Sequence, residues 1–407
     1  MRILFLSYWG LDDPLTVSTV FPHVQLLEQR PEVESILLVT VERNGTMPEF
    51  RPPFATAKTT YAPLVSQPGR NVLLTKTDDF LRFPKELAQL AAQHRSDLLL
   101  ARGAPAGALA YLVWKQTKLP FYVESFEPHA DYMLESGVWQ RYDPRYLFQR
   151  YWERKQKELA RGLMPVAENY RRHLIAEGVP AERIVTVPCS VNLTDFGYDA
   201  ARRAEVRQRL GFSPQAVVGI YVGKFGDIYY DQEAYDLFQA AAEHFGSAFR
   251  LIVLTPNPLD DVRRRLAAVG LDQTRTFVTK APHHEVPGYL SAADFAFAPI
   301  KPADCRQFCS PIKVGEYWAS GLPVVLTEGV GDDSAIIQQE GGGAIFNVQQ
   351  PASIPAAMQQ VASILRQPDY RQRTSQLAVR HRSVERARQA YALFFDSPQR
   401  NAQAASE

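Results

Sequence analysis

Cysteine is scarce in this sequence, and long apolar runs are missing. The 407 residues include only Cys189, Cys305 and Cys309, whose spacing suits neither a disulfide framework nor a structural zinc site. No stretch approaches the ~20 apolar residues that cross a bilayer. The N-terminal run ILFLSYWG is short and is followed by Asp12 and Asp13, which favours a first strand over a signal peptide. These absences favour a protein of a reducing, cytoplasmic compartment.

An excess of charge of one sign is also absent. Lys and Arg number 45 and Asp and Glu 44, so the formal net charge is +1. A protein that binds the phosphate backbone of a nucleic acid normally carries a basic excess. Nucleic acid is therefore not expected as a partner. The Asp-Asp pairs of the chain do not lie in a metal-binding context, so no metal is expected either.

Short apolar runs alternate with amphipathic stretches, such as residues 83–94 and 106–117, along the whole chain. This alternation predicts an α/β fold of parallel, doubly wound sheets. At 407 residues and 46% hydrophobic composition, the chain can form two such domains with a cleft at the strand ends. The predicted strands are RILFLSY, ESILLVTVE, DLLLARG, PFYVESF and RIVTVPC, then VVGIYVG, FRLIVLT, RTFVTKA, DFAFAPI, LPVVLT and GAIFNV.

Residues 308–327, FCSPIKVGEYWASGLPVVLT, form the most informative stretch. Ser310 followed by Pro311 predicts a helix start, with the hydroxyl capping a free backbone N–H. Gly321 and Pro323 predict the helix end, and VVLT then reads as a short buried strand.

Three polar residues of this helix, Ser310, Lys313 and Glu316, recur at intervals of three and share one side. A phosphate is stabilised at a helix N-terminus, and Lys313 adds a full positive charge. Glu316 can accept hydrogen bonds from a ribose diol. A surface helix with a capping serine and a solvated Lys/Glu pair is the alternative.

The string SPIKVGEYWASGLPVV resembles the nucleotide-sugar motif of retaining GT-B glycosyltransferases of the family-four type, SP-x-K-x-x-E-Y-x-A-x-G-x-P-V-V. The resemblance implies two Rossmann-like doubly wound lobes with a central cleft. Many members carry a further glutamate, which contacts the donor sugar, where this chain has Phe308, so that contact does not carry over. The resemblance implies that donor binding involves Ser310, Pro311, Ile312, Lys313 and Glu316.

Other stretches of the second half extend the resemblance. Gly223 and Lys224 end a predicted strand, where the family has glycine followed by a cation on the diphosphate. Lys224 and Lys313 would then both stabilise the leaving group. The block HHEVPGYLSAADFAFAPI also matches the family, in which the loop that runs here from Lys280 to His284 tends to lie near the base. This makes His283 and His284 cleft candidates, with ordinary helix-start residues as the alternative.

In the first half, polar residues follow the predicted strands. Glu127 and His129 follow one strand, and the resemblance implies that His129 contacts the donor sugar; a structural histidine is the alternative. Arg102 ends another strand and either faces an anionic acceptor or phosphate or is a loop arginine. Gly10 and Ser18 follow the first strand, where the family often places a glycine pair against the diphosphate and where an ordinary loop is an equal alternative.

The segment VPCSVNLTDFGYD resembles the family's interdomain junction, VPNGVD-x-x-F. We therefore expect an acceptor lobe over residues 1–195, closed by a C-terminal helix at about 383–398, and a donor lobe over 196–382.

A helix is predicted from the pair Asp143-Pro144 to Arg161. It combines basic residues with an apolar face, so it either packs on its own core or lies on anionic lipid. The apolar face comprises Leu147, Phe148, Tyr151, Trp152 and Leu159.

The function expected from these observations is a cytoplasmic, metal-independent and cofactor-free glycosyltransferase that retains anomeric configuration. Its donor would be a nucleoside-diphosphate sugar and its acceptor a saccharide, lipid-linked or protein-linked hydroxyl, with the inner face of the membrane as one location. A nucleotide-sugar epimerase of the same fold and a non-catalytic nucleotide-sugar-binding protein are the alternatives.

Overall fold

The computed structural model describes residues 1–396 except 44, 48, 53 and 68–71. The chain forms two compact units, Met1–Pro188 with Val384–Glu407, and Cys189–Ser383. The boundary expected at residue 195 thus falls inside the second unit, close to its first residue.

The first unit is built on a parallel sheet with strand order β3-β2-β1-β5-β6-β7. The order reverses between β1 and β5, the point at which doubly wound sheets bind ligands. A short further strand also pairs with β2. The strands are β1 (Arg2–Ser7), β2 (Ser35–Glu42), β3 (Thr59–Tyr61), β4 (Leu64–Val65), β5 (Leu98–Arg102), β6 (Phe121–Phe126) and β7 (Gly162–Pro165).

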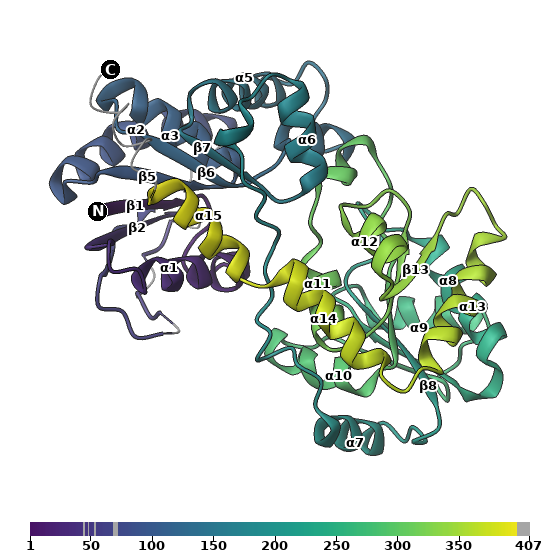
Figure 1. The fold of residues 1–407 in the computed structure, drawn as a ribbon. Coiled ribbons are helices and arrows are strands. Elements are labelled where there is room, and N and C mark those ends of the chain that lie inside the picture. Colours follow the sequence, from purple (N-terminus) through teal and green to yellow (C-terminus); the bar gives the residue numbers. More distant parts are fainter. Residues whose placement is uncertain (44, 48, 53, 68–71, 397–407) are drawn as a thin grey trace. The chain divides into compact units, whose positions relative to one another are not determined.

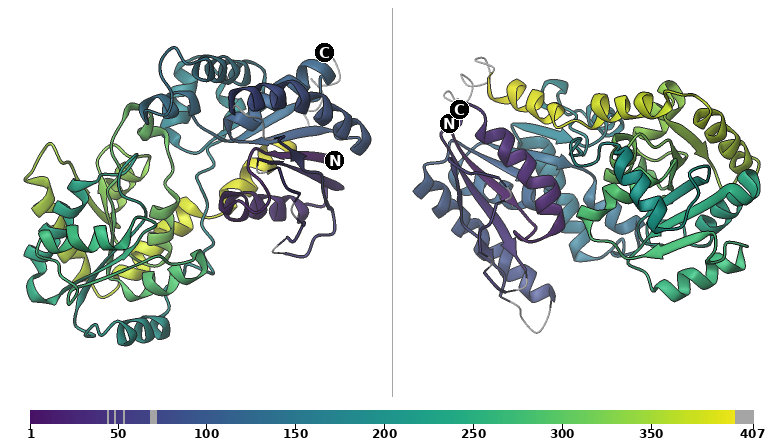
Figure 2. Two further views of the ribbon diagram at one scale, coloured as in Figure 1. Left: turned by 180° about the vertical axis from the view of Figure 1, so that it is seen from behind. Right: turned by 90° about the horizontal axis from the view of Figure 1, so that it is seen from below.

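Helices cover both faces of this sheet, as Figures 1 and 2 show. One face carries α1 (Phe21–Glu28) and α15 (Glu385–Phe395). The other carries α2 (Val72–His94), α3 (Gly103–Thr117) and α5 (Pro144–Leu159). The remaining elements are the π-helix η1 (Thr16–Val20), α4 (His129–Glu135), α6 (Glu168–Ala176) and the 3₁₀-helix η2 (Ala181–Arg183).

Helix α15 completes the core of the first unit although it comes from the end of the chain. Tyr391, Phe394 and Phe395 are buried together with residues of β1, β2 and α1. The ring centroids of Phe394 and Phe395 lie 5.5 and 5.3 Å from that of Tyr122 on β6. A Cβ at Gly162 would lie 2.7 Å from the Phe394 ring, so glycine is needed for this packing.

One predicted strand of the first unit, RIVTVPC, is wrong. The segment runs beside β7, with Val185 N–H donating to the Leu163 carbonyl and Val187 N–H to the Pro165 carbonyl. Only Leu163 and Ile184 form a bridge, however. Pro165 has no N–H to donate the next hydrogen bond of a parallel ladder. The last strand of the sheet is therefore β7, and the segment beside it does not extend the sheet.

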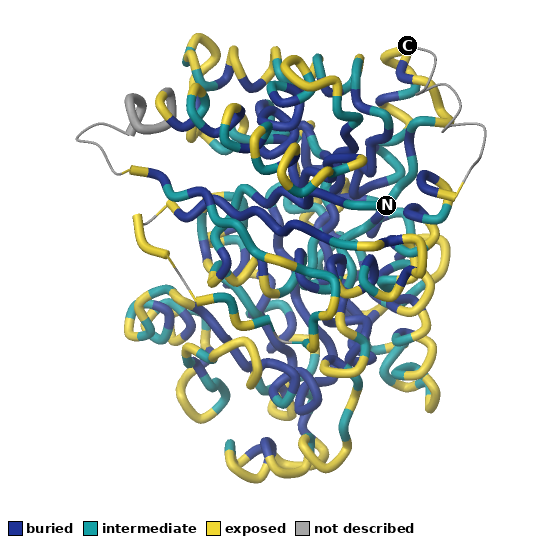
Figure 3. The backbone as a smooth tube through the Cα atoms, turned by 90° about the vertical axis from the view of Figure 1, so that its left-hand side faces the viewer, coloured by how far each residue is buried: buried dark blue, intermediate teal, exposed yellow. Residues whose placement is uncertain are grey.

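The second unit has the strand order β10-β9-β8-β11-β12-β13, all parallel, which is the Rossmann order with its reversal between β8 and β11. The six strands predicted from the sequence are confirmed, and the strands run mostly buried through each unit (Figure 3). They are β8 (Val217–Val222), β9 (Phe249–Leu254), β10 (Thr276–Thr279), β11 (Phe295–Ala298), β12 (Val324–Thr327) and β13 (Gly343–Phe346).

Two groups of helices sandwich this second sheet. One group is α7 (Ala200–Arg209), α10 (Val286–Ala292), α11 (Ile312–Ala319), α12 (Asp333–Glu340) and α14 (Tyr370–Arg382); the other is α8 (Gln232–Phe245), α9 (Leu259–Ala268) and α13 (Ser353–Leu365). Three 3₁₀ segments complete the unit, η3 (Gly246–Ala248), η4 (His283–Glu285) and η5 (Asp304–Phe308).

Helix α5 faces the protein with its polar side, contrary to one of the two expectations. Its cap is as predicted, because the Asp143 carboxylate accepts from Arg145 N–H at 2.8 Å. Its buried residues are Tyr146, Gln149, Glu153 and Gln156, whereas Leu147, Phe148 and Tyr151 are 52%, 58% and 40% exposed. Hydrogen bonds partly satisfy this polar side: Gln156 Nε2 donates to the Ala104 carbonyl at 3.1 Å, and Gln149 donates to Glu153 at 2.9 Å.

Candidate functional site

The helix α11, which carries the central motif, ends as the sequence predicts. Gly321 N–H donates to the Trp318 carbonyl and Leu322 N–H to the Tyr317 carbonyl, both at 2.9 Å, which is the Schellman pattern. Gly321 has φ +71°, a conformation that costs glycine nothing. The strand β12 follows directly, so this motif folds as one compact helix-turn-strand unit.

The predicted N-cap is wrong. The N-cap of α11 is Pro311, and among the described side chains none caps the helix. The Ser310 hydroxyl instead accepts hydrogen bonds from Cys189 N–H, at 3.1 Å, and from the buried Arg382 guanidinium. Arg382 also binds the Asp333 carboxylate. The first N–H groups of α11 therefore remain available to a ligand.

Lys313, on the first turn of α11, lies over the end of β8. Its Nζ donates to the Tyr229 hydroxyl at 3.1 Å and sits 4.3 Å from the centroid of that ring. A Cβ at Gly223 would lie only 2.5 Å from this Nζ, so the ammonium rests on backbone that only glycine leaves uncovered. Tyr317, one turn on, accepts a hydrogen bond from Val222 N–H at 3.1 Å and fixes α11 to the same strand.

Lys224 lies at the same strand end but has an acidic partner. Its Nζ donates to Asp227 Oδ2 at 2.6 Å, and this hydrogen bond lowers the pKa of Asp227. Within the described part of the chain, Lys313 makes no comparable ion pair. The site thus has one cation whose charge is not neutralised, Lys313, and a second, Lys224, whose charge is shared.

Glu316 occupies the next turn of the same helix and is 8% exposed. His283 Nε2 lies 3.3 Å from Glu316 Oε1, and the hydrogen bond to Glu316 raises the pKa of His283. His284, the other candidate from the sequence, is directed elsewhere: its side chain is 82% exposed and lies 4.0 Å from Glu285. Of the two histidines, His283 therefore joins the site.

These residues form an anion site with a carboxylate beside it. The free N-terminus of α11, the Lys313 ammonium and the backbone of Gly223 meet at the β8 end of the topological switch point. Glu316 lies further along the same helix, where it can accept hydrogen bonds from a diol. The geometry suits a phosphate next to a sugar, as in a nucleotide.

In the first unit, Arg102 is not available to an acceptor. It is buried and donates to Glu124 Oε1 at 2.8 Å. Glu124 also accepts from Tyr391 of α15 and lies 3.1 Å from His23 Nδ1. Burial would raise the pKa of Glu124, but His23 and Arg102 more than offset this and lower it to about 2. The four residues form a closed network that ties α15 to the sheet.

The loop after β1 also has an internal explanation. A Cβ at Gly10 would lie 2.4 Å from Glu42 Oε2, and Glu42 Oε1 accepts from Leu11 N–H at 3.0 Å. A carboxylate in contact with Gly10 is unfavourable for a diphosphate, which supports the ordinary-loop interpretation. The Ser18 hydroxyl, in η1, donates to the Pro14 carbonyl at 2.7 Å.

His129 begins α4 and is half-buried, with its N–H donating to the Glu127 carbonyl at 2.8 Å. Its ring lies edge-on to Trp139, with centroids 5.7 Å apart. Ala130 N–H donates to the buried Glu153 at 2.9 Å, and burial raises the pKa of Glu153 to about 8. This hydrogen bond fixes the helix start that positions His129.

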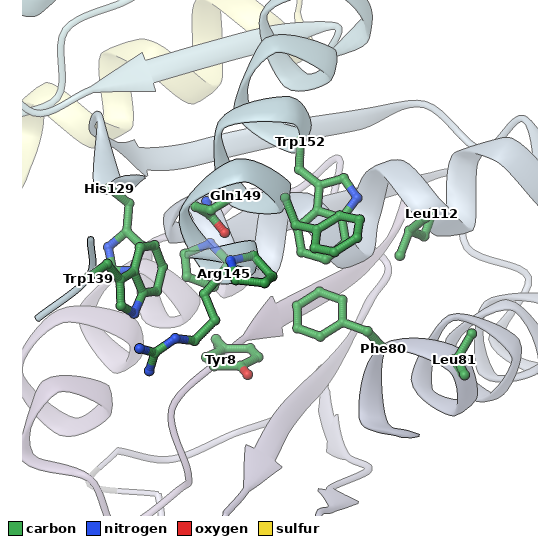
Figure 4. A pocket seen from close by; sticks show the side chains of 12 residues that line it. Tyr8, Phe80, Leu81, Leu112, His129, Trp139, Arg145, Gln149 and Trp152 are labelled. Carbon is green, nitrogen blue, oxygen red and sulfur yellow. The ribbon is translucent and has the colours of Figure 1, made fainter. Parts of the chain in front are cut away.

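Beside His129 lies a pocket of about 410 Å³, formed entirely within the first unit. Figure 4 shows His129, Trp139 and Arg145 at one end and Phe80, Trp152, Leu81 and Leu112 at the other. The rings of Phe80 and Trp152 stack with centroids 4.6 Å apart. The pocket thus has a polar end next to His129 and a long aromatic and aliphatic end.

Sequence reasoning missed several of these residues. Arg382 and Tyr229 reach the site from 72 and 84 positions away from their partners, and no local pattern marks them. Trp152 was predicted only as part of the apolar face of a helix, which does not say which face is covered, and Phe80 lies outside the stretches considered. His283 was considered, and its distance of 33 positions from Glu316 hid the pairing.

Two absences hold for the described residues. No cluster of His, Cys, Asp and Glu there has the arrangement of a metal site. In the same residues, no helix has the combination of length and apolar character that crossing a membrane requires.

Comparisons with known proteins agree with this geometry. The family described as "Glycosyl transferases group 1" matches residues 217–363, and that described as "Glycosyl transferase 4-like domain" matches residues 29–190. No curated protein matches the chain.

Several solved structures share the fold of the whole chain at low identity. HepE from Anabaena, solved with UDP, is 14% identical with a TM-score of 0.66, covering 96% of this chain and 98% of its own. Sucrose-phosphate synthase from Thermosynechococcus elongatus is 17% identical with a TM-score of 0.68, covering 100% and 99%. WaaG, described as a glycosyltransferase of lipopolysaccharide biosynthesis, is 14% identical with a TM-score of 0.67, covering 97% and 100%.

Proposed function

The chain belongs to the retaining GT-B glycosyltransferases of group 1, and from that premise we propose that it transfers a sugar from UDP-glucose or a close analogue to a hydroxyl acceptor. The observation that carries the proposal is the Lys313 ammonium lying on Gly223 at the N-terminus of α11. UDP and UDP-glucose are bound in the structures of the Anabaena neighbour. Those two ligands therefore come first among the donors to test.

The second unit would bind the donor nucleotide. Lys313, Lys224 and the N–H groups of α11, including that of Ile312 after Pro311, would stabilise the negative charge that develops on the diphosphate leaving group. Fixed dipoles and charges perform this role without reorganising during the reaction. Glu316 would accept hydrogen bonds from the ribose hydroxyls. His129 of the first unit would contact the donor sugar.

The proposal includes independence from a metal ion. Lys313 supplies the charge that a divalent cation would otherwise provide at the diphosphate. We expect UDP affinity measured by calorimetry to be unchanged by EDTA. A loss of affinity on chelation that Mg²⁺ or Mn²⁺ restores would contradict this part of the proposal.

The experiment that tests the function is a product assay with UDP-, GDP-, ADP- and CMP-sugars, each with and without hydroxyl acceptors. A glycosyltransferase releases nucleoside diphosphate faster when an acceptor is added and forms a new glycoside of unchanged anomeric configuration. An epimerase would convert its substrate without any acceptor, and a sensor would bind a nucleotide sugar without turnover. Either of these last outcomes would overturn the proposal.

Peripheral membrane contact is proposed for α5. Its exposed Leu147, Phe148 and Tyr151 lie beside the exposed cations Arg150 and Arg154, a combination that favours anionic lipid surfaces.

Sedimentation with phosphatidylglycerol vesicles should deplete the wild-type protein and deplete the double variant Leu147→Ser, Phe148→Ser much less. Leu393→Ser, which changes an equally exposed leucine on α15, is the matched control. Equal depletion of all three proteins would contradict this contact.

A further inference from the structure

The pocket of the first unit has a lining that no part of the proposed donor requires. Its aromatic and aliphatic end is formed by Phe80 and Leu81 of α2, Leu112 of α3, and Phe148 and Trp152 of α5. Nucleotides and sugars need several hydrogen-bonding partners, whereas the one polar side-chain group among these five residues is the indole N–H of Trp152. Water forms few hydrogen bonds in such a space, so an apolar ligand group is favoured there.

The other end of the pocket is polar. His129, Arg145 and Gln149 lie there together with Tyr8, which follows β1 at the topological switch point of the sheet. Burial raises the pKa of Tyr8 to about 12, so its hydroxyl stays protonated and can donate at neutral pH. Gln149 is anchored by donating to Glu153 at 2.9 Å. A hydroxyl group bound at this end would find donors and acceptors.

The apolar end continues to the protein surface. Leu81 is 68% and Phe148 58% exposed, and both line the pocket. Helix α5, which contributes Phe148, turns its polar residues inward and its apolar residues outward. Because these exposed apolar side chains also line the pocket, a ligand can enter its apolar end from solvent or from a lipid surface.

We infer that this pocket binds the hydrocarbon chain of a lipid-linked acceptor, with the acceptor hydroxyl at the His129 end. The inference rests on the proposed function and selects one acceptor class from those the sequence left open. The occupant is an amphiphile because the lining has two ends of different polarity. A free saccharide would leave the aromatic end unfilled.

Titration calorimetry with alkyl β-glucosides, below their micelle concentrations and without a donor, tests the inference. Each additional buried methylene should tighten binding about fourfold, so each step from hexyl to octyl to decyl, which adds two methylenes, should tighten it about fifteenfold. Methyl glucoside should not bind measurably. Binding that does not depend on chain length, or equal binding of methyl glucoside, would overturn the inference.

Variants inside and outside the pocket test whether the alkyl glucosides bind there. Leu112→Trp fills the apolar end and should weaken decyl glucoside at least tenfold, while Leu393→Trp, an equal change outside the pocket, should leave it unchanged. If Leu112→Trp alters the fold, seen as a lower Tm, Leu81→Asp at the exposed rim should still weaken binding severalfold. Equal effects of the pocket and control variants would overturn the assignment.

The outcome is distinguishable from failure of the proposed function. UDP binding, which is assigned to the second unit, should not change in the same variants when the apolar end is filled. Chain-length-dependent binding without any transferase activity would contradict the function and keep the pocket assignment. Transfer to soluble acceptors, with alkyl glucoside binding that does not depend on chain length, would support the function and contradict the pocket assignment.

Discussion

The two units of this protein share one strand order and differ in what lies at the strand ends. In the second unit, β8 ends at Gly223, and Lys313 rests on that backbone with no carboxylate partner among the described residues. In the first unit, β5 ends at Arg102, whose charge is neutralised inside by Glu124. The topology therefore provides the location of a site, and the residues at the strand ends decide its chemistry.

The surfaces next to these strand ends differ in the same way. The second unit offers a helix N-terminus and cations, which suit a phosphate. The first offers a pocket with stacked aromatic rings, which suits an apolar group. A polar donor site in one unit and a largely apolar acceptor pocket in the other would let the enzyme bind two very different substrates.

The largest effect is expected on the free energy of unfolding, when the buried ion pair of the first unit is removed. Glu124→Gln removes the carboxylate and leaves the buried Arg102 without its ion-pair partner, which should cost about 3–5 kcal/mol of unfolding free energy. Denaturant unfolding followed by tryptophan fluorescence measures it, because of the five tryptophans only Trp318 lies in the second unit.

Tyr391→Phe is the matched variant for this network. It removes the hydroxyl that donates to Glu124 and lies 2.7 Å from His23 Nδ1, and it keeps the ion pair with Arg102, so the loss should be smaller, about 1.5–3 kcal/mol. UDP affinity should not change in either variant while the protein is folded. An unfolding curve of Glu124→Gln that overlays the wild type would show that the network does not hold α15.

In the second unit, Lys313→Ala should weaken UDP binding about ten- to a hundredfold, because a hydrogen bond to an ionised group contributes roughly 1.5–3 kcal/mol. Uridine, which lacks phosphates, should bind as before. Gly223→Ala should act in the same direction, since its Cβ would displace the ammonium. Calorimetry with both ligands checks this, and an equal loss of uridine affinity would place Lys313 away from the phosphates.

Glu316→Ala should weaken uridine and UDP by a similar factor, about tenfold, because the carboxylate would contact the ribose that both ligands share. The buried position of Glu316 makes a melting curve of the variant a necessary control. If uridine binds to the variant as to the wild type, the ribose assignment of Glu316 is wrong.

The smallest expected effect concerns pH. The pKa of His283 is raised by its hydrogen bond to Glu316, so the stability from this pair is complete below about pH 6.5. It is lost as the pH rises through the higher folded-state value. The imidazole is 66% exposed, so the contribution is small. NMR titration should give a pKa above 6.5 that returns to its ordinary value in Glu316→Gln; an identical titration in both proteins would contradict the pairing.

The sequence predicted most of the fold and the helix and strand at the centre of the second unit's candidate site. Strand alternation and the motif at residues 310–325 are local patterns, in which capping, turn and helix periodicity all act within a few positions of each other. Gly321 is an example, because the need for a positive φ at that turn can be read from the residue type alone.

Long-range partners could not be predicted in the same way. The Ser310 hydroxyl has a capping role in local terms, and only the packing of α14 brings Arg382 close enough to take it. The orientation of α5 likewise depends on backbone groups of α3 and α4 that form hydrogen bonds with Gln156 and Glu153. Periodicity identifies the two faces of a helix and does not say which one is covered.

The placement of α15 sets an order of events during synthesis of the protein. Every residue of the second unit is synthesised before Tyr391, Phe394 and Phe395, whereas the first unit lacks part of its core until those residues are made. Although most of the first unit is synthesised first, it therefore cannot complete its core before the whole second unit has been translated. A chain that stops at Ser383 would contain all of the second unit and lack α15 of the first.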